Sequence, residues 1–172
     1  IKLELSGYMY GENIMKKRII AVLSLIIGVV VGQCIAQRNM FKKLEEAQMM
    51  SDKHLELFKV MTQWVKVKQE GKNIADVLKE EGYLKIAVYG MSYVGESLVN
   101  ELKDTGVRVL YGIDKNVDRI SSTVDIVSIN DNLEPVDAII VTAISFFDEI
   151  NKELSKKIDC PIISLDDIIY IL

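Results

Sequence analysis

The sequence is poor in the residues that most often build metal centres and disulfide frameworks. It has one histidine, His54, and two cysteines, Cys34 and Cys160, among 172 residues. Neither cysteine has a neighbour at the spacing of metal ligands, and two thiols do not make a disulfide framework. A single histidine excludes most histidine-based metal sites and any two-histidine mechanism. We therefore predict no metal site, and we interpret both cysteines as small buried hydrophobic residues.

The sequence also lacks an excess of positive charge. Its 21 Lys and Arg residues stand against 25 Asp and Glu, which gives a formal net charge of −4. Proteins that bind a nucleic-acid backbone do so through clustered basic side chains. We therefore expect no nucleic-acid partner. The remaining composition, 49% hydrophobic and 27% charged, is typical of a globular protein.

A long apolar run, residues 19–36, lies near the N-terminus, with only Ser24 and Gln33 as polar members. As a helix it would span roughly 27 Å, close to the apolar thickness of a bilayer. Basic residues flank the run on both sides, so the positive-inside rule does not fix its orientation. We interpret residues 15–38 as a single-pass anchor in the cell membrane. The domain that follows looks intracellular, which places it on the cytoplasmic side.

A cleaved signal peptide is the alternative for the same run. The basic residues before it, the apolar centre and the small-ended triplet Cys34-Ile35-Ala36 all fit one. We favour the uncleaved anchor because of the intracellular character of the following domain. Upstream, residues 1–14 show no clear periodicity, and Met15 before a basic triplet looks like a natural start. We therefore interpret residues 1–14 as a disordered extension.

The linker, residues 39–82, is predicted to be helical. Residues 39–69 lack proline and glycine and are rich in good helix formers. Spacings of three and four define one stripe, as in a coiled-coil seam. The stripe could pair with a second copy, giving a homodimer through residues 40–68, or pack on the chain's own next domain. Both interpretations remain open. Its members are Leu44, Ala47, Met50, His54, Leu57, Met61, Trp64 and Lys68.

The rest of the chain, residues 83–172, alternates short apolar runs with helical segments. This alternation predicts right-handed crossovers and a parallel sheet covered on both faces. We expect a small Rossmann-like α/β domain with five strands in the order 3-2-1-4-5, preceded by the transmembrane helix and the long amphipathic helix. After Gly71, Asn73 is expected to cap a short helix that Gly82 ends. The expected strands are 84–89, 107–113, 125–129, 138–143 and 161–164, and the expected later helices begin near 95, 147 and 165.

A glycine turn follows the first expected strand and precedes a helix. In dinucleotide-binding turns three glycines serve the tight turn, the approach of the diphosphate and the close packing of the helix. Gly90 and Gly95 match the first and third glycines, and Ser92 takes the second place. Backbone N–H groups at such a helix start can bind a phosphate. The candidate binding loop therefore runs Gly90, Met91, Ser92, Tyr93, Val94 and Gly95.

Three further positions extend this candidate site. Asp114 follows Gly90 by 24 positions, where a carboxylate would accept both ribose hydroxyls of an adenosine and repel a 2′-phosphate. This favours NAD over NADP. Lys115 follows Asp114, and Thr142 and Ala143 end the fourth expected strand on the same sheet edge. The alternative interpretation is that the two glycines serve only the turn and helix packing, with Asp114 an ordinary strand end.

Several segments give a family resemblance: 85–95, Tyr111-Gly112-Ile113-Asp114, 136–142 and 160–165. The chain resembles small bacterial Rossmann-like proteins that accompany capsule or surface-polysaccharide genes. It is also similar to the nucleotide-sugar-binding domain of bacterial sugar acyltransferases, but the hexapeptide repeats of those enzymes do not follow. The resemblance implies NAD or a nucleotide sugar as ligand and polysaccharide-biosynthesis enzymes as partners. No residue pair shows a catalytic base with its orienting group, so we expect a binding module, with a ligand-free scaffold or a sugar-nucleotide oxidoreductase as alternatives.

Overall fold

The computed structural model describes residues 2–117 and 122–172, and the chain divides into two compact units, Ile1–Asp52 and Lys53–Leu172. Helix α1, Lys2–Gln69, runs through the first unit and continues into the second. The expected anchor and linker helix are thus one helix, because no proline occurs between them. Since α1 begins at Lys2, it also takes in most of the segment 1–14 that the sequence set apart as an extension.

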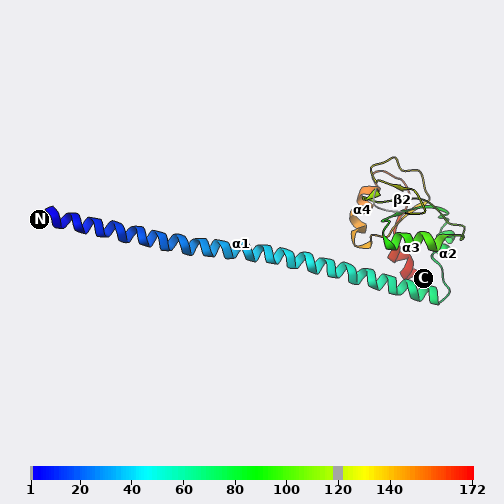
Figure 1. The fold of residues 1–172 in the computed structure, drawn as a ribbon. Helices are drawn as coiled ribbons and strands as arrows, with labels where there is room; N and C mark the ends of the chain where they lie inside the picture. The colour runs from blue at the N-terminus through cyan, green and yellow to red at the C-terminus, as the bar shows by residue number, and fades with distance from the viewer. Residues whose placement is uncertain (1, 118–121) are drawn as a thin grey trace. The chain divides into compact units, whose positions relative to one another are not determined.

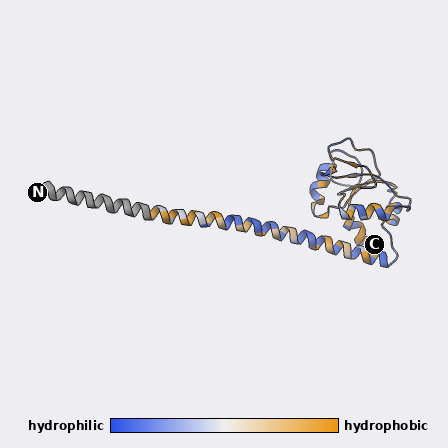
Figure 2. Cartoon of the chain, in the orientation of Figure 1, coloured by the Kyte–Doolittle hydropathy of each residue, from blue (hydrophilic) through white to orange (hydrophobic). Residues whose placement is uncertain are grey.

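The apolar part of α1 is solvent-exposed along its described length. By length and composition, the described stretch Leu23–Gln69 is sufficient to cross a membrane, and none of its most apolar window is buried inside the protein. Leu25 is 70% exposed and Val29 54%. Figure 2 shows the apolar stretch of α1 giving way to a polar one. A helix buried in the protein's own core would not leave these side chains exposed, so the apolar stretch needs another apolar environment.

The second unit contains the predicted sheet. Its five strands are parallel throughout and lie in the order β3-β2-β1-β4-β5, which confirms the order expected from the sequence. The strands are β1 Lys85–Tyr89, β2 Arg108–Ile113, β3 Ile126–Val127, β4 Ala138–Val141 and β5 Ile162–Ser164. The third is the shortest, two residues long, where the sequence suggested five.

Helices cover both faces of the sheet (Figure 1). Alternate residues of β1 point to opposite faces, with Ile86 and Val88 on one and Ala87 and Tyr89 on the other. The first face packs against α2, α3, α5 and the end of α1, and the second against α4. These helices are α2 Ile74–Glu80, α3 Tyr93–Leu102, α4 Phe147–Leu154 and α5 Leu165–Ile171, with a 3-10 turn, η2, at Ile144–Phe146.

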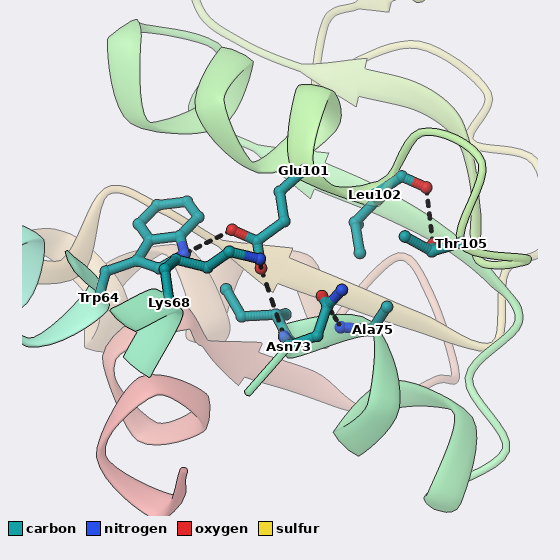
Figure 3. A network of polar contacts seen from close by, with 8 residues as sticks. Trp64, Lys68, Asn73, Ala75, Glu101, Leu102 and Thr105 are labelled. Atoms are coloured by element: carbon teal, nitrogen blue, oxygen red, sulfur yellow. Dashed lines mark hydrogen bonds and ion pairs between the residues drawn. The ribbon is translucent and has the colours of Figure 1, made fainter. Parts of the chain in front are cut away.

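The C-terminal end of α1 packs on the chain's own α/β domain. Val60, Trp64 and Val67 are buried there. The Trp64 Nε1 donates a hydrogen bond of 2.7 Å to Glu101 Oε2 of α3, and the Lys68 ammonium lies 3.3 Å from the other carboxylate oxygen (Figure 3). This largely buried carboxylate joins the two helices through charge-assisted hydrogen bonds.

The buried face of α1 differs from the predicted stripe. Of that stripe only Trp64 is buried and Met61 partly buried, whereas Leu44, Met50 and Leu57 are exposed. Val60 and Val67, which the predicted stripe omits, complete the contact instead. The stripe thus packs on its own domain only near its C-terminal end, and pairing of two copies through residues 40–68 stays a prediction. The N-cap of α2 is as predicted, since the Asn73 side chain accepts a hydrogen bond from the Ala75 N–H at 3.0 Å.

Candidate functional site

The site forms where β1 ends and the chain turns into α3. Gly90 has φ of +93°, a conformation that favours glycine, and a Cβ there would lie 2.8 Å from Thr142 Oγ1. A Cβ on Gly95 would lie 2.3 Å from the Gly90 carbonyl oxygen. The turn and the close approach of α3 therefore both require glycine. These requirements hold with or without a ligand, so the glycines alone do not establish one.

A pocket of about 380 Å³ opens beside this turn, at the carboxyl edge of the sheet. Ligands of open parallel sheets bind at that edge, and small-molecule pockets range from about 300 to 1,000 Å³. The turn, the end of β2 and the first turns of α4 form its walls. The lining residues are Tyr89, Gly90, Ser92, Asp114, Lys115, Asn116, Ala143, Phe146, Glu149, Ile150 and Glu153.

Asp114 is half-buried and connects the end of β2 to the glycine turn. Its Oδ2 accepts a hydrogen bond from the Met91 N–H, and its Oδ1 accepts one from the Asn116 N–H, each at 2.9 Å. The Met91 N–H therefore already has an acceptor within the protein. Each carboxylate oxygen has two lone-pair positions, so Asp114 can still accept one further hydrogen bond at each.

The structure brings together only half of the predicted site residues. Gly90, Ser92, Asp114, Lys115 and Ala143 line the pocket. The other five residues of the predicted site do not line it: Met91 and Val94 are buried below the turn, Tyr93 is 92% exposed, Gly95 packs on the Gly90 carbonyl, and Thr142 is 5% exposed.

Thr142 stabilises the turn from beneath. Its hydroxyl lies within hydrogen-bond distance of two carbonyl oxygens, that of Gly90 at 2.5 Å and that of Tyr89 at 3.1 Å. A buried hydroxyl engaged in this way fixes the backbone of the turn. The sequence placed Thr142 at the correct sheet edge, but its side chain faces the protein instead of the pocket.

Tyr89 lines the pocket, although the sequence did not single it out. It is the last residue of β1 and is 4% exposed. Among the described residues its hydroxyl has no hydrogen-bond partner, although the oxygen is buried. Burial raises the pKa of Tyr89 above its usual value, and the nearby Glu153 and Asp114 carboxylates raise it further. The phenol is therefore protonated and can donate to a bound molecule. The only signal in the sequence is a tyrosine immediately before the first glycine.

Carboxylates outnumber cations among the described residues of the pocket wall. These are Asp114, Glu149 and Glu153 against Lys115, which is exposed. Glu149, Glu153 and Phe146 were not among the site residues predicted from the sequence. Glu149, Ile150 and Glu153 belong to α4. They therefore lie beyond the strand ends, which are the only positions that the glycine-turn pattern identifies.

The walls of the pocket also touch α1. Ser145 Oγ donates a hydrogen bond of 2.6 Å to Glu56 Oε2, and the Lys53 ammonium lies 3.9 Å from the centre of the Phe146 ring. Both contacts fall within the second unit, and the latter is a cation–π contact. The 3-10 turn η2 is thus joined to the end of α1. In the described part of the chain, no cluster of His, Cys, Asp and Glu side chains could hold a metal ion.

The fold and the pocket define a small α/β domain with a five-stranded parallel sheet and a ligand-sized cavity at the carboxyl edge. No family model, curated protein or solved structure matches the chain.

Proposed function

We propose that the protein is a membrane-anchored module that binds a nucleoside-containing small molecule, with NAD and nucleotide sugars among the candidates. The observation that supports this most is the position of Asp114. It lies at the end of β2, beside the glycine turn and in the wall of a pocket, with a lone pair free on each oxygen. Vicinal ribose hydroxyls suit such a carboxylate.

Binding without chemistry is favoured over catalysis. Among the described lining residues there is no histidine and no cysteine, and the hydrogen bonds made by Asp114 go to backbone N–H groups. A nucleophile needs an adjacent base, and that base an orienting partner. The described pocket wall includes the Ser92 hydroxyl, and no histidine lies in that wall to act as its base.

The membrane part of the proposal is supported by the apolar stretch of α1, which is long enough to span a bilayer. The resemblance of residues 85–95 to domains from surface-polysaccharide loci supports an accessory role beside enzymes of that biosynthesis. We propose a single pass with the α/β domain in the cytoplasm, where nucleotide sugars are made available to such enzymes.

Calorimetric titration of the full chain in lipid nanodiscs tests the binding proposal. Adenosine, NAD and UDP-glucose would be compared on the native chain and on Asp114→Asn. We expect at least one ligand to bind, and the substitution to weaken it about 10-fold to 100-fold, as expected for loss of a charged hydrogen-bond acceptor.

Asp76→Asn is the matched control, since Asp76 is exposed on α2, away from the pocket. It should leave the affinity unchanged. If none of these ligands binds at millimolar concentration, the result favours the alternative of a ligand-free scaffold.

A further inference from the structure

The described wall of the pocket carries more negative than positive charge. Among the described lining residues, three carboxylates, from Asp114, Glu153 and the exposed Glu149, and one exposed ammonium, from Lys115, border the same cavity of about 380 Å³. A diphosphate group brings two more negative charges into this space. Like charges in a partly desolvated site repel each other strongly, because water screens them less there than in bulk.

The glycine turn offers a phosphate less than its sequence suggests. The N–H of Met91, the residue directly after Gly90, already donates a hydrogen bond to Asp114 Oδ2 at 2.9 Å. A phosphate at the turn would have to displace that carboxylate or approach it closely. At this one N–H, the protein's own carboxylate thus occupies the place that a phosphate oxygen could take.

The Tyr89 hydroxyl gives an independent indication of a ligand. It is buried with no hydrogen-bond partner among the described residues, and it belongs to a side chain that is 4% exposed in the pocket wall. An unsatisfied buried donor is costly, so such a group usually has a partner in the functional state. Burial, and then the Glu153 and Asp114 carboxylates, raise the pKa of Tyr89, so the phenol keeps its proton. An acceptor on a ligand would satisfy this donor.

A nucleoside has the complementary groups. Its vicinal hydroxyls can donate to the free lone pairs of Asp114, and an exocyclic amino group can donate to Glu149 or Glu153. A ring nitrogen of the base can accept from Tyr89. Apolar contacts for the base come from Ile150 and Phe146. None of these interactions uses a phosphate.

We propose that the pocket recognises an amino-bearing nucleoside without phosphate, uncharged or cationic, and discriminates against its phosphorylated forms. This inference rests on the proposed function, because it names the ligand class of the same site. It orders the candidates: adenosine should bind more tightly than AMP, and AMP more tightly than ADP or NAD. The cavity, near the lower limit of the usual range of about 300–1,000 Å³, is also small for a dinucleotide.

Titration of the full chain in nanodiscs with adenosine, AMP and ADP tests the proposal. We expect affinity to fall at each phosphate, by about 10-fold or more from adenosine to ADP, as several unfavourable charge pairs imply. Inosine, which lacks the exocyclic amino group, should bind more weakly than adenosine. ADP binding as tightly as adenosine would overturn this inference and leave the proposed function intact. Failure of every nucleoside and nucleotide to bind would overturn both.

Charge variants of α4 show whether the carboxylates cause the discrimination. In the double variant Glu149→Gln/Glu153→Gln the adenosine-to-ADP affinity ratio should fall several-fold. Asp148→Asn removes a charge from the same helix at an exposed position that does not line the pocket, and it should leave the ratio unchanged. An unchanged ratio in the double variant would contradict the proposed cause.

A Tyr89→Phe variant tests the donor. It removes a buried, unpartnered hydroxyl and little else, so the melting temperature without ligand should stay the same or rise. Adenosine affinity should nevertheless fall about 5-fold to 10-fold, the effect of one lost hydrogen bond. Unchanged adenosine affinity with an intact fold would remove Tyr89 from the proposal.

Discussion

Tyr111 shows how one buried side chain makes stability depend on pH. Its hydroxyl donates a hydrogen bond of 2.6 Å to the Glu134 carbonyl oxygen. Burial, and then the nearby Cys160 and Glu134, raise the pKa of Tyr111 to about 12 from the usual 10.0. The folded state therefore holds the phenolic proton over a range in which the unfolded state has released it. This stabilisation is fully present below pH 10.0 and is lost as the pH rises toward about 12.

We expect the free energy of unfolding to fall between these two pH values, and Tyr111→Phe to reduce that dependence. Urea titrations monitored by circular dichroism, repeated across the alkaline range, measure it. Tyr170, which is 57% exposed, supplies the control variant Tyr170→Phe. Equal alkaline slopes in Tyr111→Phe and the native chain would contradict the assignment.

A substitution at Gly95 tests whether α3 approaches the turn as closely as the structure shows. Substitution of Gly95 by alanine would place a methyl group 2.3 Å from the Gly90 carbonyl oxygen, so the backbone must shift. We expect Gly95→Ala to lower the free energy of unfolding by about 1–3 kcal/mol, as overpacking usually does. Ser97→Ala, at an exposed position in the same helix, should change it by less than about 0.5 kcal/mol. Denaturant midpoints of the two variants decide the point.

At the scale of single residues, the sequence predicted those parts of the site that follow from strand ends. Gly90, Asp114 and Ala143 each end or follow a strand, and parallel strands bring their carboxyl ends to one edge. Tyr89 was missed because a buried strand tyrosine looks like a core residue. The direction of Thr142 could not be predicted either, since the twist and register of the sheet decide which way a strand-end side chain points.

At the scale of elements, the end of α1 behaves as part of the α/β domain. Trp64 is the chain's single tryptophan, 4% exposed and hydrogen-bonded to Glu101. Trp64→Ala should lower the free energy of unfolding by about 3–5 kcal/mol, the usual effect of removing a buried aromatic side chain. The neighbouring Val65 is 53% exposed, and Val65→Ala should change little. Equal losses in the two variants, measured by chemical denaturation, would show that the contact is not formed.

Element boundaries in the α/β domain followed from the sequence more closely than those of α1. Short apolar runs bounded by glycine and polar residues define buried parallel strands well. The buried stripe of α1 was misplaced because exposed apolar residues are frequent along that helix, so periodicity does not identify the face that packs. The position of α4 beside the turn, and with it Glu149 and Glu153 in the pocket, depends on how the crossover packs on the sheet.

At the scale of the whole molecule, the proposed topology predicts that the α/β domain lies on the cytoplasmic side of the membrane. A cysteine introduced as Ser155→Cys, at an exposed position after α4, in a chain with Cys34 and Cys160 replaced by serine, would report it. In intact cells an impermeant maleimide should not label it, and labelling should appear after permeabilisation. Labelling of intact cells would place the domain outside, and recovery of a shortened soluble product would indicate a cleaved signal peptide.

The Phe146 ring lines the cavity and also contacts α1. The Lys53 ammonium of α1 lies 3.9 Å from the centre of the ring. A molecule that displaces the ring must also break this contact and disturb the adjacent bond between Ser145 and Glu56. By thermodynamic reciprocity, any change that weakens the contact between Lys53 and Phe146 would then favour binding of such a molecule by the same free energy.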